Sequence, residues 1–181
     1  GDVYKRQFPA KLTDCGAHAF DELSYPGDSI KQEYKEDILV GYRWHDTKEI
    51  PALFPFGHGL SYTTFTYGKP VASAKTMAAD GTLTVTVAVK NTGSIAGKEI
   101  VQLYIGDDKC SVLRPVKELK HFAKVALAPG EEKNVTFTLT PDDLKFYDEA
   151  SAAWKYEPGK FKAYVCASSA DVRGVVSFEM Q

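Results

Sequence analysis

The chain has 181 residues and a formal net charge of −2, and 44% of its residues are hydrophobic, 12% aromatic and 25% charged. This is the composition of a globular protein, but the chain is too short for a (β/α)₈ barrel of about 250 residues together with a second domain. The near-neutral charge argues against nucleic-acid or anionic-membrane binding, which need a basic surface, and no apolar run approaches the roughly 20 residues that span a bilayer.

The first seven residues differ in character from the rest of the chain. Residues 2–7 resemble the in-frame translation of a transposase adapter used in sequencing libraries, which reads Asp-Val-Tyr-Lys-Arg-Gln. We therefore expect residues 1–7 to be a non-native tail and the natural sequence to begin near Phe8; an ordinary polar tail is the alternative. These residues also lack the apolar region of a signal peptide. Three Cys are too few for a disulfide scaffold, so the compartment stays open.

Residues 8–67 are irregular and rich in turn formers. Pro and Gly divide this stretch into short pieces. The one clear regular element is the apolar run at 37–42, which is suited to a buried strand. Because no independent core can be recognised, we expect these residues to be the end of a larger domain.

From about Pro70 onward, hydrophobic residues alternate with polar ones, which is typical of strands with one buried face. The expected strands cover residues 83–89, 101–105, 125–127, 135–140, 161–167 and 176–180. Asn91 and Gly93 predict a turn because both tolerate positive φ, and Pro129-Gly130 predicts a type II turn. Helical pattern is limited to a single turn at 141–144. We therefore expect a mainly β fold, an antiparallel sandwich of about seven strands.

Several segments resemble one family. Residues 34–46 and residues 53–65 (Leu-Phe-Pro-Phe-Gly-His-Gly-Leu-Ser-Tyr-Thr-Thr-Phe) closely resemble the end of the α/β sandwich domain of family 3 glycoside hydrolases. Residues 87–104, 114–122 and 127–131 are similar to the fibronectin type III-like domain of the same enzymes. The sequence Tyr-Arg-Trp-His-Asp at 42–46 is most like the β-glucosidases, although β-xylosidases share the architecture.

The resemblance implies a division of the chain. Residues 8–67 would be an irregular remnant of the α/β sandwich domain and a linker, and residues 68–181 an immunoglobulin/fibronectin type III-like β-sandwich. The implied partners are the missing (β/α)₈ barrel and the rest of the α/β domain of the same enzyme. Whether the barrel lies upstream or downstream is open, as is the sugar specificity. No cofactor is implied.

The resemblance also implies a function that these residues cannot perform alone. The family consists of retaining glycosidases, in which an Asp nucleophile on the barrel and a Glu acid/base in the α/β domain lie about 5–5.5 Å apart. Neither motif occurs in this sequence, so we assign no catalytic residue. We expect a non-catalytic buttress of a β-glucosidase-like hydrolase, whose β-glucoside substrate binds only in the full-length protein.

Two groups of residues are candidates for a role in that enzyme. Trp44, His45 and Asp46 could border a sugar-binding cleft, because aromatic faces stack on sugar C–H groups and His and Asp bind hydroxyls; simple packing against the barrel or sandwich is the alternative. Residues expected to pack the two domains together are Phe54, Phe56, His58, Tyr62 and Phe65. The His58 side chain lies between glycines with no nucleophile or orienting group beside it, which favours a structural role.

Other functional classes find less support in the sequence. The four His and three Cys show no metal-ligand spacing. A free-standing fibronectin-like module that binds carbohydrate or protein would need a surface row of Trp or Tyr, but Trp44 and Trp154 lie far apart in the sequence. Tyr147 is expected to be either a corner tyrosine tied to the backbone or a plain core aromatic.

Overall fold

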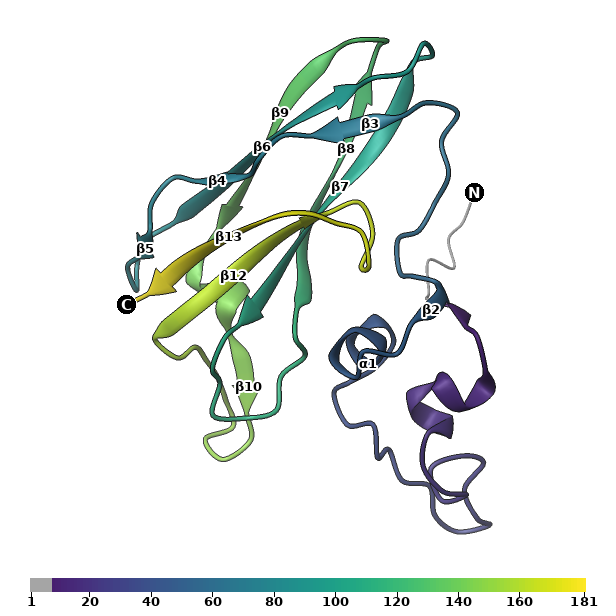
Figure 1. The fold of residues 1–181 in the computed structure, drawn as a ribbon. Helices are drawn as coiled ribbons and strands as arrows, with labels where there is room; N and C mark the ends of the chain where they lie inside the picture. The colour runs from purple at the N-terminus through teal and green to yellow at the C-terminus, as the bar shows by residue number, and fades with distance from the viewer. Residues whose placement is uncertain (1–7) are drawn as a thin grey trace.

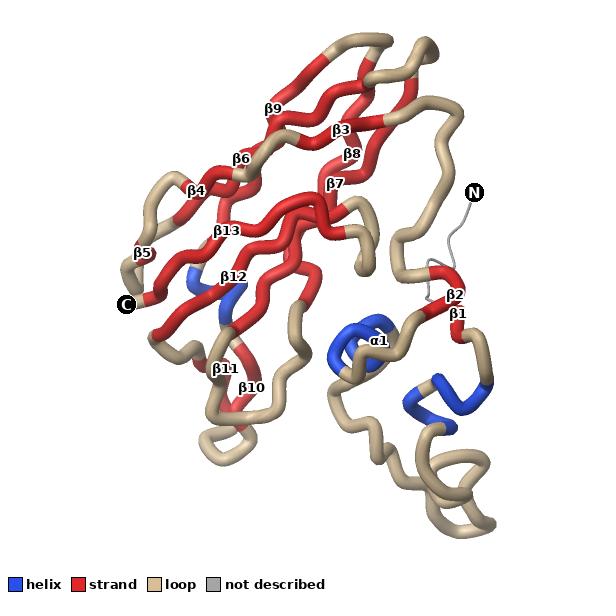
Figure 2. The backbone as a smooth tube through the Cα atoms, in the orientation of Figure 1, coloured by secondary structure: helices blue, strands red, loops and turns tan. Residues whose placement is uncertain are grey.

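The computed structural model describes residues 8–181, so the expected non-native tail at 1–7 lies outside the described residues. Two mostly antiparallel sheets face each other and form a sandwich (Figure 1), which confirms the predicted fold class. The N-terminal part of the chain lies beside the sandwich and consists mostly of loops, with one short helix and two 3-10 turns (Figure 2).

The larger sheet has five strands and the smaller sheet four. In spatial order the larger sheet contains β5 (Thr76–Met77), β13 (Val172–Met180), β12 (Gly159–Cys166), β7 (Gly97–Asp107) and β8 (Glu118–Leu127). In the smaller sheet, the central β6 (Leu83–Asn91) pairs with β9 (Glu132–Leu139) on one side and with β3 (Phe65–Tyr67) and β4 (Val71–Ala72) on the other. Among the described strand pairs, only the two-residue pairing of β5 with β13 is parallel. The remaining short elements are β1 (Phe8–Pro9), β2 (Ala52–Phe54), β10 (Phe146–Asp148), β11 (Ala153–Lys155), α1 (Tyr42–Thr47) and the 3-10 turns Leu12–Asp14, Gly16–His18 and Pro141–Leu144.

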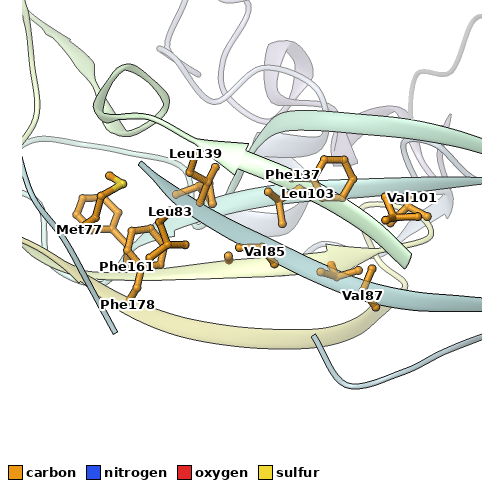
Figure 3. Packing of buried hydrophobic residues seen from close by; sticks show 14 of the residues in the cluster. Met77, Leu83, Val85, Val87, Val101, Leu103, Phe137, Leu139, Phe161 and Phe178 are labelled. Carbon is orange, nitrogen blue, oxygen red and sulfur yellow. The ribbon is translucent and has the colours of Figure 1, made fainter. Parts of the chain in front are cut away.

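The hydrophobic core lies between the two sheets (Figure 3). Along β6 every second residue from Leu83 to Val89 is buried, as the alternation predicts. In the close-up, Phe161 of β12 lies beside Phe178 of β13, and their ring centroids are 5.8 Å apart. Each fully buried side chain of this size stabilises the fold by about 1.5–3 kcal/mol, so the sandwich has a core of its own.

Strand β7 is buried on both faces, which the sequence alternation does not predict. Leu103 points into the core as expected, but Gln102 and Tyr104 on the opposite face are also buried. The N-terminal segment covers this outer face: Tyr42 of α1 contacts the Tyr104 ring edge-on at a centroid distance of 5.6 Å. The outer face of the larger sheet is therefore a packing surface.

The strand predicted at residues 37–42 is wrong. This run begins in a turn, and from Tyr42 onward the chain is helical in α1. Asp37 and Gly41 both adopt positive φ (56° and 68°), so the backbone is not extended at either end of the run. Within it Leu39 is buried, while Val40 is exposed.

The turns were predicted with mixed success. Gly130 has φ 75° and the Glu131 amide donates to the Ala128 carbonyl (3.0 Å), which confirms the type II turn. The single helical turn at Pro141–Leu144 is also confirmed. Near Asn91 the expected reason for the turn is wrong, because neither Asn91 nor Gly93 has a positive φ. None of the helices within residues 8–181 has the length and apolar character needed to cross a membrane.

Candidate functional site

The candidate cleft residues Trp44, His45 and Asp46 lie together on α1, a six-residue helix beside the larger sheet. Gly41, with its positive φ, turns the chain into the helix, and the helix ends after Thr47. A helix this short is not stable by itself, so its position depends on what it contacts.

Two hydrogen bonds fix α1 to the start of β8 and the residues just before it. The Val116 amide donates to Thr47 Oγ1 (3.0 Å), and the Leu119 amide donates to Tyr42 Oη (2.8 Å). The first and last residues of the helix are therefore both tied to the same short segment. Because β8 is an edge strand of its sheet, its outward backbone amides are available for such partners.

Two ion pairs lie between these hydrogen bonds. Lys117 Nζ donates to Asp46 Oδ2 (2.6 Å) and both side chains are largely buried. Arg43 Nη2 lies 3.4 Å from Glu118 Oε1. We call these four interactions the α1–β8 contact: residues 42, 43, 46 and 47 of the helix meet residues 119, 118, 117 and 116 in antiparallel order.

Burial changes the ionisation of both carboxylates in the α1–β8 contact. Burial raises the pKa of Asp46, and the hydrogen bond from Lys117 only partly offsets this. Burial also opposes ionisation of Glu118, but the cations Lys120, Arg114 and Arg43 outweigh it and lower the pKa of Glu118. Lys117 Nζ additionally lies 5.6 Å from the centre of the Tyr104 ring, a cation–π distance.

The other two candidate cleft residues point into the N-terminal segment. Trp44 is only 6% exposed; its Nε1 donates to the Asp14 carbonyl (3.0 Å) and Phe20 contacts its ring edge-on. His45 Nδ1 lies 3.0 Å from the Ile50 carbonyl oxygen. In this chain the Trp44 ring is therefore not available to stack on a sugar, and a cleft-bordering role for α1 stays a prediction.

A cavity of about 370 Å³ lies beside α1, lined by His45, Asp46, Lys117 and Ser169 among others. The Nε2 atom of His45 has no hydrogen-bond partner among the described residues. Within residues 8–181, no three His, Cys, Asp or Glu side chains are grouped so that they could hold a metal ion. The site thus consists of a positioned helix and its buried charges.

The residues expected to pack domains together divide into two groups. Phe56 contacts Tyr42 (centroid distance 5.1 Å), and Phe65 packs against the sandwich core from β3. In contrast, Phe54 is half exposed with His58 beside its ring (5.7 Å), and Tyr62 is 97% exposed. Phe56 and Phe65 therefore contact the helix and the sandwich core, whereas Phe54 and Tyr62 are largely exposed; an interdomain role for the whole set stays a prediction.

Sequence reasoning missed Gln102 and Lys117. Tyr104 Oη donates to Gln102 Oε1 (2.5 Å), and Gln102 Nε2 donates to the Ala167 carbonyl (3.1 Å), so this buried amide is satisfied at both ends. The Phe56 carbonyl accepts from the Ser169 amide (2.8 Å) nearby. The strand pattern gave no signal for this second buried face, because a polar residue at an outward position of an alternating strand predicts exposure.

Tyr147 is neither a corner tyrosine nor a core residue. It is 51% exposed on β10 and contacts Trp154 of β11 edge-on (centroid distance 5.7 Å). Trp44 is buried in the N-terminal segment, so the two tryptophans of the chain form no surface row.

Comparison with known proteins gives consistent matches. Residues 99–169 match the fibronectin type III-like domain family. The chain is 67% identical over 172 residues to the β-glucosidase BoGH3A of Bacteroides ovatus, covering 95% of this chain and 23% of that protein.

Solved structures give the same result. DesR, a β-glucosidase from Streptomyces venezuelae in complex with D-glucose, superposes with a TM-score of 0.88 at 40% identity, covering 97% of this chain and 22% of that one. The GH3 β-glucosidase of Bifidobacterium adolescentis gives 0.87 at 34% identity, with 97% and 25% covered. The chain spans a quarter or less of the length of these three proteins.

Proposed function

We propose that this chain, which belongs to glycoside hydrolase family 3, is the non-catalytic structural part of a β-glucosidase-like enzyme that hydrolyses O-glycosyl bonds with retention. Support comes from its sequence identity to β-glucosidases over nearly the whole length of this chain. The chain covers about a quarter or less of those proteins. On this proposal residues 8–67 are the end of the α/β domain with its linker, and residues 68–181 are the fibronectin type III-like domain.

The observation that carries the proposal is the α1–β8 contact. It fixes a helix from the N-terminal segment, at both ends and by two ion pairs, onto a sandwich with its own core. The sandwich thereby holds α1 in one orientation relative to itself. A domain that positions a segment of its neighbour, and adds no reacting group, acts as a buttress.

The distribution of apolar side chains supports a missing partner surface. Before residue 63 only Leu39 and Trp44 are buried large hydrophobic residues among those described, while twelve others are exposed, among them Ile30, Leu60 and Tyr62 at 94–97%. Contiguous exposed apolar surface is typical of an interaction site. The barrel and the rest of the α/β domain are the partners that would cover it, and they would supply the nucleophile, the acid/base and the β-glucoside pocket.

Two measurements test the proposal. The chain alone, mixed with an aryl β-glucoside, should give no turnover above a blank. Exchanging the matching segment of the Bacteroides ovatus β-glucosidase for this chain should give an active enzyme, whereas deleting that segment should abolish activity. Turnover by the chain alone, or full activity without the segment, would overturn the buttress role.

A further inference from the structure

A second concave surface, which shares no lining residue with the cavity beside α1, lies at the β10–β11 hairpin. This hairpin projects from one end of the sandwich (Figure 2). It lines a groove of about 880 Å³ together with residues 112–115 and with Ile38 and Arg43 of the N-terminal segment. We call it the Trp154 groove. Apart from Arg43 and Glu118, the residues that line it lie outside the α1–β8 contact.

Two exposed aromatic rings form a corner in the Trp154 groove. Tyr147 and Trp154 are directly opposite each other in the β10–β11 pairing and therefore project on the same side. Their ring planes meet at 72°, so one ring makes a floor and the other a wall. Trp154 is 66% exposed and Tyr147 51%, which leaves both rings free for a ligand with an apolar face.

Polar contacts stabilise the hairpin that carries the two rings. Asp148 Oδ2 accepts hydrogen bonds from the Ser151 amide (3.1 Å) and from Lys155 Nζ (2.5 Å), which close the loop between β10 and β11. The aromatic corner is thus formed before any ligand arrives, and preorganised side chains lose less conformational entropy on binding.

The charges in the Trp154 groove balance. Four cationic side chains, including Arg43 and Lys120, and four anionic ones, including Glu118, line it. An anionic or cationic ligand would meet as many like charges as opposite ones, so the groove favours a neutral ligand. Carboxylates and guanidinium groups bind hydroxyls well, because they offer paired acceptors or donors.

We propose that the Trp154 groove binds a neutral gluco-oligosaccharide. Trp154 and Tyr147 stack on the C–H faces of a pyranose ring, and the charged side chains of the groove hydrogen-bond its hydroxyls. The choice of β-linked glucose as the sugar rests on the proposed function. The aromatic corner and the balanced charge are observed independently of that proposal. The groove holds sugar without reacting with it and so adds binding area outside the catalytic centre.

The test uses the full 181-residue chain and cellotetraose. Titration should give a saturable change in tryptophan fluorescence, because Trp154 is exposed while Trp44 is buried. By calorimetry, Trp154→Ala and Tyr147→Ala should each bind at least about tenfold more weakly, a loss of about 1.4 kcal/mol. The matched control is Phe122→Ala, which removes an aromatic ring that is 70% exposed on β8, outside the groove, and should leave binding unchanged.

Three outcomes would overturn the proposal. They are no binding of cellotetraose at millimolar concentration, equal binding by the Trp154→Ala and Phe122→Ala variants, or tighter binding of a charged oligogalacturonate than of cellotetraose. None of these results affects whether the β-glucosidase that carries the exchanged segment is active. The proposed function is therefore tested separately from sugar binding in the groove.

Discussion

Asn91, at the end of β6, joins three separate parts of the chain through one buried side chain. Its Oδ1 accepts from Thr63 Oγ1 (2.6 Å) and from the Gly93 amide (3.0 Å). Its Nδ2 donates to the carbonyls of Ile95 (2.8 Å) and Leu127 (3.1 Å). Both the acceptor and the two donors of the amide are thus satisfied, which is what a fully buried polar group requires.

Replacing Asn91 with Ala should destabilise the chain. The substitution leaves two carbonyls and two donors without their partner, and we expect the free energy of unfolding to fall by about 2–3 kcal/mol. Urea denaturation followed by circular dichroism measures this. Thr86→Val is the matched control, because it keeps the β-branched shape, removes only the exposed hydroxyl that pairs with Thr136 and should change stability by less than about 0.5 kcal/mol. Equal effects of the two substitutions would contradict this prediction.

Among the structural elements, the six-residue helix α1 depends on its contacts with β8. Within the α1–β8 contact, the Asp46–Lys117 pair is buried, so desolvation of the two charges offsets much of their attraction. Replacing both residues of such a pair with apolar ones should change the free energy of unfolding little. Removing only one of them should lower it strongly.

A double-mutant cycle tests this. Lys117→Met leaves Asp46 buried without its cation, and we expect a loss of about 3 kcal/mol in the free energy of unfolding. The double variant Asp46→Leu/Lys117→Met should recover most of it, because an apolar pair fills the same space. Denaturant titration of the four proteins gives the coupling energy. A double variant as unstable as the sum of the single ones would show that the two charges are not coupled.

Glu118 should make the α1–β8 contact sensitive to acid. Its pKa in the folded chain is lower than in the unfolded chain, whose value is about 4.3. Glu118 therefore contributes stability above that value and loses it as the pH falls through the lower folded pKa. Asp46, with a raised pKa, acts with the opposite sign. Unfolding measured from pH 6 to pH 3 should show a shallower pH dependence for Glu118→Gln than for the unmodified chain; identical slopes would contradict the prediction.

For the whole molecule, the stable unit should extend beyond the sandwich. A chain of residues 40–181 keeps α1 and the cover over Gln102 and Tyr104, whereas a chain of residues 60–181 exposes both. We expect the shorter chain to be several kcal/mol less stable, because a buried Tyr and a satisfied amide lose their environment, and the 40–181 chain to lie much closer to the full chain. Urea midpoints of the three chains measure this. Equal stability of the 40–181 and 60–181 chains would contradict this prediction and would place the N-terminal boundary of the stable unit after α1.

The sequence predicted the elements whose burial is one-sided. In strand β6 hydrophobic and polar residues alternate, because one face of the strand packs into the core. The strand could therefore be predicted from this alternation. Strand β7 also alternates in sequence and was predicted, but both of its faces are buried, and only its neighbours in space explain why Gln102 is covered. Helix α1 spans fewer than two turns, too short for a helical repeat, and its position follows from contacts with residues far away in the chain. The exposed Tyr147–Trp154 pair was likewise invisible, because aromatic residues in strands are usually buried.

The contact between Tyr42 and Leu119 also sets an order of events during synthesis, since 77 residues separate them. At about 5–20 residues per second, the ribosome needs roughly 4–15 s to deliver the second residue after the first. Throughout that interval the helix can contact the N-terminal segment through Trp44, but it lacks the surface of β8. A pause in translation before the codon for Leu119 would therefore prolong the time for which this segment is open to chaperones and proteases.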